Sequence, residues 1–551
     1  MKRIIEKDLT DSQSHKIFAL ILIYAIASRL YFIFRYGGHW LCSDTSVFTR
    51  IISSVSDSGQ IFSEGTRLYA HGFGYPVTAS IHSFIAGVPI QTYQQYLHPI
   101  LGVIPILLAY PFFLRVIKSK KIALLSTFLL ASIPEVLFET SRGTHATFTY
   151  TMIILSAYVL AVIIDSGVGY RKSLAMWVIL CLSLFALISF NVMMAVVFIL
   201  AIIVSFAIGS IFYGRLKKFV VPSHLFLSSI LGVALLALMM FCIYPPAAGV
   251  IGFITRTGGA ITQLVPEIVT PEPGAVTLEP SPVTPEPGAV TLEPSPVTPQ
   301  LTVPSSYQYV QEAWRSVPTY LFLTLANWVV GLLSLICWGV AIYLLIVRKK
   351  EYHPSLLLLL SLYTGLGLVL ATSLLSDWMG RSAMNLELRV FPLFMIFSAP
   401  LAGILVSKII NYTKRGKLKV ASLTILSILI VLFAVNAPLK ATSEPSLCRH
   451  WHFYSVTEES GVRWLSASGE TIAMWKGAEP EGWENRLSNL KAFLGYYNIH
   501  GVPGEKANYV LISDIIRRRS GVVNIPIPDI SASSKIYAAG DVAIYNKVSS
   551  K

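Results

Sequence analysis

The chain has 551 residues, of which 54% are hydrophobic and only 13% are charged. Soluble proteins carry about 25% charged residues, so a soluble fold of this composition could not cover its surface with polar groups. An ordinary cytosolic enzyme and a disordered chain are therefore excluded. Five cysteines in so long a chain also exclude a disulfide scaffold. The composition predicts a polytopic α-helical membrane protein, and the net charge of +14 has to be explained in that context.

The apolar residues gather in eleven runs that are long enough to cross a bilayer. A hydrocarbon core of ~30 Å needs about 20 apolar residues per helix. The predicted spans are residues 17–36, 95–117, 121–140, 146–165, 174–190, 193–213, 220–244, 317–346, 354–374, 388–409 and 419–437. We therefore expect about 11 transmembrane helices, all within a membrane domain at residues 1–438.

Basic residues are distributed unevenly between alternate connections. Five connections hold 17 basic residues, counting the helix edges, whereas the other five hold six. The positive-inside rule then places the N-terminus in the cytoplasm and the chain after about residue 438 outside. This asymmetry accounts for the excess positive charge, so no nucleic-acid partner is expected.

All long segments between or after the spans fall on the predicted outer side. Residues 37–94 form the first outer loop, and a Pro-rich spacer at 266–304 contains a sequence at 269–282 that is repeated at 283–296. Proline favours an extended, polyproline-like chain, so we expect the spacer to be a disordered tether. Residues 440–551 have an ordinary soluble composition with helix-like and strand-like stretches, which predicts a small α/β domain outside.

The first outer loop contains an amphipathic helix. Phe48, Ile51, Ile52 and Val55 recur at the spacing of one helix face, which predicts a helix lying along the membrane interface. Asp44 stands just before this helix. Its carboxylate could cap the helix by accepting hydrogen bonds from the free amides of the first turn. It could equally act as a general base on a substrate held at the membrane surface.

This loop resembles the first outer loop of the GT-C glycosyltransferase superfamily. The resemblance rests on Asp44 shortly after the first span, the helix with Phe48 and Ile51, the Gly59-x-hydrophobic turn, and the Tyr-x-x-Gly-x-Gly-Tyr-Pro stretch at 69–76. The superfamily includes dolichyl-phosphate-mannose protein mannosyltransferases and bacterial lipid A aminoarabinose transferases. The resemblance implies a polytopic enzyme that transfers a sugar from a polyprenyl-phosphate carrier with inversion. It covers the first four spans and the 388–409 region, whereas the tail matches only in position.

Two features of the superfamily are missing from this sequence. No acidic residue follows Asp44 at the next two positions, so a DxD-type metal site is not supported, no metal ligand is assigned, and the cofactor stays unknown. No Trp-Trp-Asp-like signature is present either, which argues against an oligosaccharyltransferase acting on Asn sequons.

A second cluster of polar residues ends the third predicted span. Glu135 and Glu139 share one helix face near the outer boundary, which makes both candidate catalytic carboxylates because ionisable groups at membrane depth usually face a polar cavity. The alternative is an interfacial pair neutralised by Arg142 or His145, two residues that are also candidate substrate ligands. Arg29, inside the first span, could point into a polar groove or pair with an acid such as Glu135.

The remaining candidates would bind substrate. The resemblance places Arg389 where a late-helix arginine binds the lipid phosphate, and a guanidinium suits that role because it forks onto phosphate oxygens; the alternative is an arginine that reaches up to lipid headgroups. Arg381 lies nearby in the sequence as a second phosphate ligand. Tyr69, His71 and Tyr75 belong to the aromatic, Gly-rich part of the first loop, where His71 could orient sugar, bind a metal or simply lie at the surface.

These observations favour an inverting glycosyltransferase whose partners are membrane lipid, a polyprenyl-phosphate sugar donor, and a glycan, lipid or protein acceptor. Asp44 would be the base. Alternative functions are a transporter or flippase of lipid-linked sugars, a surface-polysaccharide polymerase or ligase, and a non-catalytic anchor. The expected location is a prokaryotic cell membrane, archaeal more than bacterial, with Cys42 and Cys448 outside, where a disulfide between them is permitted.

Overall fold

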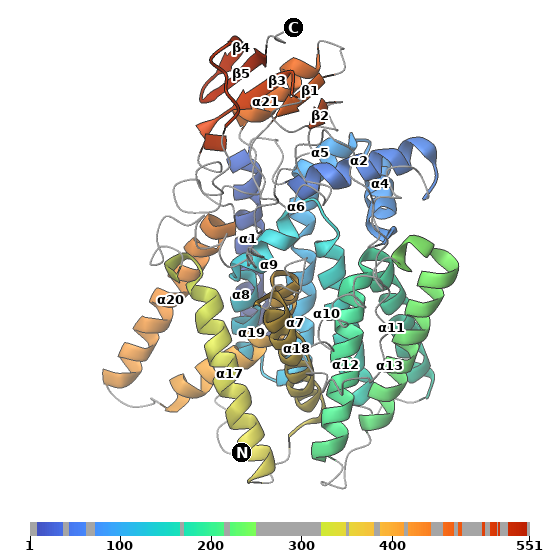
Figure 1. Cartoon of the computed structure of the whole chain (residues 1–551). Helices are drawn as coiled ribbons and strands as arrows, with labels where there is room; N and C mark the ends of the chain where they lie inside the picture. Colours follow the sequence, from blue (N-terminus) through green and yellow to red (C-terminus); the bar gives the residue numbers. More distant parts are fainter. Residues whose placement is uncertain are drawn as a thin grey trace, which may run out of the picture.

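The structure is a computed structural model, drawn in Figure 1. It describes residues 8–36, 43–61, 72–165, 170–213, 221–248, 321–348, 352–378, 386–412, 417–441, 456–467, 472–475, 499–501, 507–514, 516–517 and 527–547. The predicted Pro-rich spacer, Cys42 and Cys448 lie outside these residues.

Every predicted span within the described residues is a helix. Eight segments are long and apolar enough to cross a membrane. They are α1 (Asp11–Tyr36), the run through α5 (Ile90–Thr92), η1 (Tyr93–Leu97), α6 (His98–Leu101) and α7 (Ile104–Ile117), α10 (Ala146–Ile164), α13 (Val221–Leu238) with η3 (Met239–Ile243), α17 (Leu325–Ile346), α18 (Pro354–Trp378), α19 (Leu386–Tyr412) and α20 (Lys417–Ala441). The shorter apolar helices α11 (Tyr170–Phe190) and α12 (Val192–Tyr213) occupy two more predicted spans, and the 3-10 turn η4 (Pro245–Ala248) follows η3. The predicted fold class is confirmed.

The third predicted span, at 121–140, is bent into two helices. α8 (Lys120–Ala131) and α9 (Pro134–Ser141) meet at an angle of 66°. The cause is Pro134, the first residue of α9, because proline disfavours helical backbone in the residue before it. Ile133 is accordingly extended, with φ −83° and ψ 115°. The bend turns α9, which carries Glu135 and Glu139, across the end of the bundle.

Close helix contacts in the core depend on small residues. A Cβ on Gly365 of α18 would lie 2.5 Å from the carbonyl oxygen of Ala201 on α12, so only glycine allows these backbones to approach so closely. At the same crossing, the Ser205 hydroxyl donates to the carbonyl of Ser361 at 2.8 Å. Small-residue packing and interhelical hydrogen bonds therefore hold α12 and α18 together.

Two helices of the first loop lie across one end of the bundle, α2 (Ser43–Ser58) and α4 (Gly74–Ala86). The amphipathic pattern of α2 is confirmed, but Phe48 and Ile52 are buried against aromatic residues of the protein rather than facing lipid. The exposed apolar residues belong to α4 instead, where Phe84 is 86% exposed. The sequence predicted that α2 contacts lipid at the membrane interface. The exposed apolar residues of α4 are the better candidates for that contact.

The tail forms the small α/β unit that the sequence predicts. It contains α21 (Val456–Ser466) and a five-stranded sheet in the order β2-β1-β3-β5-β4. The strands are β1 (Ile472–Trp475), β2 (Ile499–Gly501), β3 (Tyr509–Ile512), β4 (Ser533–Ala539) and β5 (Val542–Lys547). β1 pairs in parallel with β2 and β3, whereas β4 and β5 form an antiparallel hairpin, and the unit has its own apolar core.

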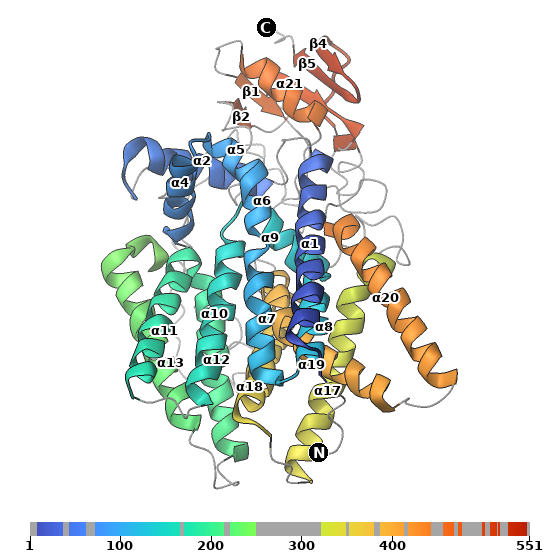
Figure 2. The ribbon, with the colours of Figure 1, turned by 180° about the vertical axis from the view of Figure 1, so that it is seen from behind.

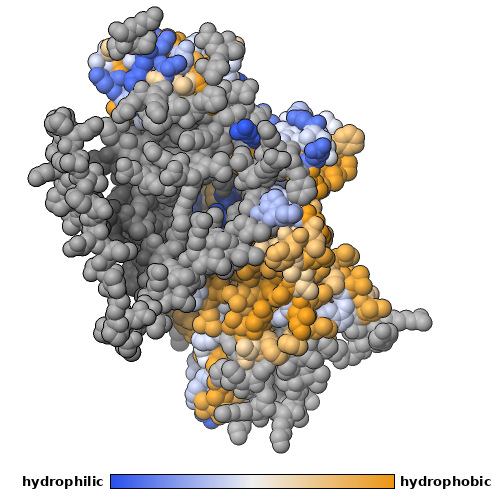
Figure 3. Space-filling model, turned by 45° about the vertical axis from the view of Figure 1, so that its right-hand side comes forward, coloured by the Kyte–Doolittle hydropathy of each residue, from blue (hydrophilic) through white to orange (hydrophobic). Residues whose placement is uncertain are grey.

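The two ends of the bundle differ in what they carry. The sheet and the first-loop helices lie at one end, hereafter the sheet end, and α1 begins at the opposite end (Figures 1 and 2). Figure 3 shows apolar residues gathered over the bundle below α2 and α4, with hydrophilic residues on the sheet above. This arrangement fits a multi-pass membrane protein, with the start of α1 and the tail sheet at opposite ends of the bundle.

Candidate active site

The predicted site residues on the described chain lie at the sheet end. These are Glu135, Glu139, Arg142, His145, Tyr75 and Arg389. Asp44 belongs to α2, with its side chain outside the described residues, and Tyr69, His71 and Arg381 lie outside them altogether. Because α2 begins at Ser43, Asp44 is part of its first turn rather than the residue preceding the helix.

The first turn of α2 packs on the turn that joins α9 to α10. A Cβ on Gly143 would lie 2.9 Å from Cγ2 of Thr45 and 2.4 Å from Oε1 of Gln94. Only a residue without a side chain fits between these groups. The backbone between Arg142 and His145 therefore lies directly against the residue that follows Asp44.

Phe48 joins two of the predicted substrate ligands. Its ring meets Tyr75 at 5.2 Å between centroids and His145 at 5.4 Å, edge to face in both cases. Such edge-to-face pairs are a favoured aromatic geometry. The apolar face of α2 thus contacts both Tyr75 of α4 and His145, the residue before α10, through one ring.

Asn191 fixes the orientation of His145 and was missed by the sequence reasoning. It precedes α12, and its side-chain oxygen accepts a hydrogen bond from the amide of Met194 at 3.1 Å, as an N-cap residue does. The NH₂ group is left to donate to the His145 ring, where it lies 3.1 Å from Nδ1 and 3.2 Å from Nε2. His145 therefore accepts here through an unprotonated ring nitrogen. The sequence did contain a signal, because Asn191 is a lone amide between two apolar runs.

Behind these residues lies a buried chain of polar side chains. The Tyr75 hydroxyl donates to Gln94 at 2.5 Å and lies 3.2 Å from Nδ1 of His98. Nε2 of His98 is 3.3 Å from the hydroxyl of Thr147, which donates to the carbonyl of Thr140 at 2.9 Å. The chain connects the first loop to α6, α9 and α10, so it fixes the position of the α9–α10 turn.

Glu135 and Glu139 both form ion pairs, which supports the alternative interpretation of this cluster. Arg142 donates to Glu139 through Nη2 at 2.5 Å and Nε at 3.1 Å. Glu135 pairs with Lys440 on α20 at 2.8 Å, a partner that the sequence did not suggest. The expected neutralisation by Arg142 is therefore seen for Glu139, whereas His145 bonds Asn191.

Arg29 does not pair with Glu135, contrary to one of the two expectations. It is 1% exposed, and it donates to the carbonyl of Ala25 at 2.9 Å and to Thr140 at 2.7 Å. Its Nε has no hydrogen-bond partner, and no carboxylate of the described residues forms an ion pair with it. A buried guanidinium without a counter-charge is unusual, because burying an uncompensated charge is costly.

Arg389 lies near the Glu139–Arg142 pair. It is exposed at the start of α19, and it acts electrostatically on Tyr150 of α10, as do Glu139 and Arg142. α9 also contacts α19. Arg389 and the Glu139–Arg142 pair thus lie within electrostatic range of the same tyrosine.

One further histidine lies beside this cluster. Burial lowers the pKa of His82 on α4, and its Nδ1 lies 3.1 Å from the Tyr93 hydroxyl.

Among the described residues, no group of three or more His, Cys, Asp or Glu side chains could hold a metal ion.

The fold is similar to that of solved structures of an archaeal oligosaccharyltransferase and of ArnT. Archaeal oligosaccharyltransferase AglB from Archaeoglobus fulgidus, solved with an inhibitory peptide and a dolichol-phosphate, matches with a TM-score of 0.57 at 12% identity over 91% of this chain and 69% of its own. ArnT from Cupriavidus metallidurans, in the apo state, matches with a TM-score of 0.51 at 9% identity over 98% of both chains.

The Archaeoglobus enzyme also matches in a complex with Zn and sulfate, with a TM-score of 0.51 at 11% identity over 90% of this chain and 68% of its own. The sequence matches no protein-family model and no curated protein. At identities this low, the likeness concerns the fold, and the chemistry has to be argued from this chain's own residues.

Proposed function

We propose that the protein is an inverting glycosyltransferase that moves a sugar from a polyprenyl-phosphate carrier to an acceptor hydroxyl at the sheet end. One observation carries this proposal: the first turn of α2, which contains Asp44, packs on the α9–α10 turn, and α9 in turn contacts α19, the helix that carries Arg389. A carboxylate, and an arginine with no ion pair to the described residues, at the same end of a membrane bundle supply the two functions that the reaction needs.

Asp44 is the general base in this mechanism. Its carboxylate takes the proton of the acceptor hydroxyl while that oxygen attacks the anomeric carbon from the face opposite the phosphate. The bond between the anomeric carbon and the phosphate oxygen breaks, and its electron pair leaves with the phosphate. The products are an inverted glycoside, a polyprenyl phosphate and a proton on Asp44.

The other two carboxylates are already engaged by cations of the chain. Glu139 accepts two hydrogen bonds from Arg142, and Glu135 is paired with Lys440. Their role in the proposal is to hold Arg142 and α20 in place beside the site.

Arg389 holds the donor phosphate, together with Arg381. A guanidinium donates in a fork to two phosphate oxygens and stabilises the charge that develops on the leaving group. Arg142 is already engaged by Glu139, so it serves as a positioning residue for the α9–α10 turn. Tyr75 and His145 shape the sugar site on either side of Phe48, and Tyr69 and His71 extend it along the first loop.

What is known of the structural neighbours supports a lipid-phosphate donor and leaves the acceptor open. AglB was solved with a dolichol-phosphate and a peptide. The Archaeoglobus enzyme was also solved with Zn, so the metal requirement of this protein is tested directly below. We take the donor to be a polyprenyl-phosphate monosaccharide and the acceptor to be a cell-envelope glycan, lipid or protein.

The test is the Asp44→Asn variant of the purified full-length protein. The assay follows release of polyprenyl phosphate from a panel of polyprenyl-phosphate monosaccharides with cell-envelope acceptors. Asn caps a helix about as well as Asp, so a capping role predicts nearly normal activity. Loss of a general base predicts a decrease of ~10²–10⁴-fold in rate with an unchanged melting temperature.

Asp57→Asn is the matched control, because Asp57 is an exposed carboxylate at the other end of α2 and should leave activity unchanged. Transfer by Asp44→Asn at more than about a tenth of the wild-type rate would remove Asp44 from the mechanism. Repeating the wild-type assay with a chelator reports whether a divalent metal takes part.

A further inference from the structure

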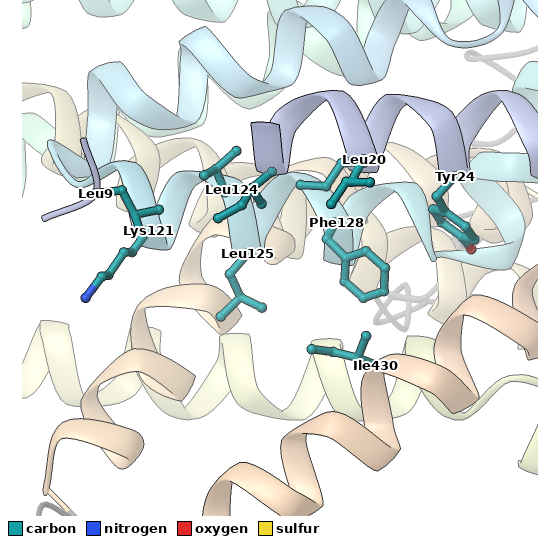
Figure 4. A pocket seen from close by; sticks show the side chains of 10 residues that line it. Leu9, Leu20, Tyr24, Lys121, Leu124, Leu125, Phe128 and Ile430 are labelled. Atoms are coloured by element: carbon teal, nitrogen blue, oxygen red, sulfur yellow. The ribbon is translucent and has the colours of Figure 1, made fainter. Parts of the chain in front are cut away.

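An apolar groove opens on the side of the bundle, and none of the candidate site residues lines it. It lies between α1, α8 and α20, and it encloses ≈ 470 Å³. Ile17 and Leu20 of α1, Leu124 and Phe128 of α8 and Ile430 of α20 line it. Figure 4 shows Ile430 across from Phe128, with Tyr24 at one end of the groove and Lys121 at the other.

The groove exists because α20 leaves the bundle. Near the sheet end, α20 is tied to its neighbours by the Lys440–Glu135 ion pair and by the Tyr24 hydroxyl, which donates to the Ala434 carbonyl at 3.4 Å. Further from the sheet end its side chains are exposed, as Val420 is at 67%, and Figure 1 shows the helix diverging there. Tyr24 therefore closes one end of the groove, and the other end opens at the start of α8.

The ammonium group of Lys121 stands at the open end. Asp8 accepts hydrogen bonds from the backbone amides of Lys120 and Lys121 at 2.9 and 3.3 Å, so its charge is used to cap α8. Asp11 pairs with the Lys120 ammonium at 2.7 Å. The exposed Lys121 side chain has no ion-pair partner among the residues that the structure describes.

An anionic phospholipid has the chemistry to fill this site. Its acyl chain matches the apolar walls, and its phosphate matches the Lys121 ammonium. The positive-inside rule assigns this end of the bundle to the cytoplasmic leaflet, where anionic headgroups attract basic side chains at about 1 kcal/mol per Lys or Arg. A zwitterionic lipid would match the walls equally well but would gain less from Lys121.

We propose that this groove binds one anionic phospholipid of the cytoplasmic leaflet, with an acyl chain between α1, α8 and α20 and the phosphate at Lys121. The lipid fills the space that the divergence of α20 leaves open, and it supports the half of that helix with few protein contacts. This inference does not depend on the proposed transferase activity, because no site residue lies in the groove.

Native mass spectrometry of the full-length protein in detergent, titrated with phosphatidylglycerol or phosphatidylcholine, tests the proposal. The wild type should retain one phosphatidylglycerol in preference to phosphatidylcholine, by about fivefold. Lys121→Gln should abolish this preference while weak binding of both lipids persists. Leu20→Trp, at a 64% exposed groove position, should exclude both lipids without disturbing the core.

Lys16→Gln is the matched control, since Lys16 is an exposed lysine of α1 near the same end that does not line the groove, and it should leave both affinities unchanged. A photoreactive residue in place of Ile430 should cross-link to lipid. Equal retention of the two lipids by the wild type would overturn the proposal. So would an unchanged preference in Lys121→Gln, or cross-linking of position 430 to residues 1–7 instead of lipid.

Discussion

Buried ionisable groups occur at both ends of the bundle, but their charges are compensated differently. At the end away from the sheet, the 3% exposed Asp165 side chain meets Arg115 and Lys118 at 2.7 Å and His353 at 3.1 Å. It also accepts a hydrogen bond from the Ser355 hydroxyl. Every oxygen of this carboxylate is used, so the cluster clamps three connections together.

At the sheet end, buried charge and hydrogen-bonding capacity are left over. Arg29 has no carboxylate partner among the described residues, and Nε2 of Gln94 and Oε2 of Glu135 are buried without hydrogen bonds. Full compensation indicates a group whose function is to hold the structure, whereas incomplete compensation is typical of sites that bind something further. Asp165 is therefore assigned a structural role, and the proposed function makes the sheet end the reactive one.

The largest effect is expected at the structural end. Asp165→Ala leaves Arg115, Lys118 and His353 without their shared partner, so the free energy of unfolding should fall by about 3 kcal/mol. This is the lower end of the range for breaking a buried ion pair, because these cations are partly exposed. The melting temperature in detergent should fall, while the rate per folded molecule stays the same. A lower rate at an unchanged melting temperature would reverse the assignment of the two ends.

The same cluster makes a pH prediction. Burial alone would raise the pKa of Asp165, but hydrogen bonds from Lys118 and Ser355 and the charges of His353 and Arg115 outweigh it and lower the pKa. A group with a lowered folded-state pKa contributes stability above its unfolded value, near 3.9, and loses it as the pH falls through the folded value. The difference in stability between wild type and Asp165→Ala should therefore be constant near neutral pH and shrink below about pH 4.

Arg389→Ala should have the next largest effect, at the reactive end. Losing a charge-assisted, forked contact to phosphate costs about 1.5–3 kcal/mol, or roughly 10- to 150-fold in donor use. Arg389→Lys should recover only part, because an ammonium keeps the charge and loses the fork. If all three forms release polyprenyl phosphate equally, Arg389 is a residue that reaches lipid headgroups and has no catalytic role.

Much of the fold was accessible from the sequence because it depends on local patterns. Hydrophobic length fixed the eleven spans, and helical spacing of Phe48, Ile51, Ile52 and Val55 predicted α2. The bend in the third span was not predicted, although Pro134 is its cause. The apolar face of α2 was expected to meet lipid, and it packs on protein because α4 and α10 lie beneath it.

The site was less accessible because its contacts join distant parts of the chain. Glu135 meets Lys440 only because α20 docks on α9, and no spacing rule connects residues so far apart. Arg29 could be identified as unusual, but its lack of a counter-charge depends on which side chains surround it. Residue type and position suggested Arg142 and His145 as site residues. The structure was needed to show that Arg142 pairs with Glu139 and that His145 contacts Asn191.

The smallest expected effect concerns Asn191, which makes one hydrogen bond that holds the structure and one that reaches a candidate site residue. Its side-chain oxygen caps α12 through the Met194 amide, and its NH₂ group donates to His145. Asn191→Ser keeps a good N-cap residue and removes the donor to His145, whereas Asn191→Ala removes both. Loss of the cap costs about 1 kcal/mol of stability, so the alanine variant alone should melt at a lower temperature.

Loss of the bond to His145 should act on the reaction instead. A hydrogen bond of this kind contributes about 0.5–1.5 kcal/mol, so both variants should transfer sugar roughly 2- to 13-fold more slowly if His145 has to be held in one orientation. The serine variant is the decisive one, because it separates the two bonds within one residue. If it melts and reacts like the wild type, His145 is oriented by Phe48 alone, and Asn191 belongs with Asp165 among the residues that only hold the structure.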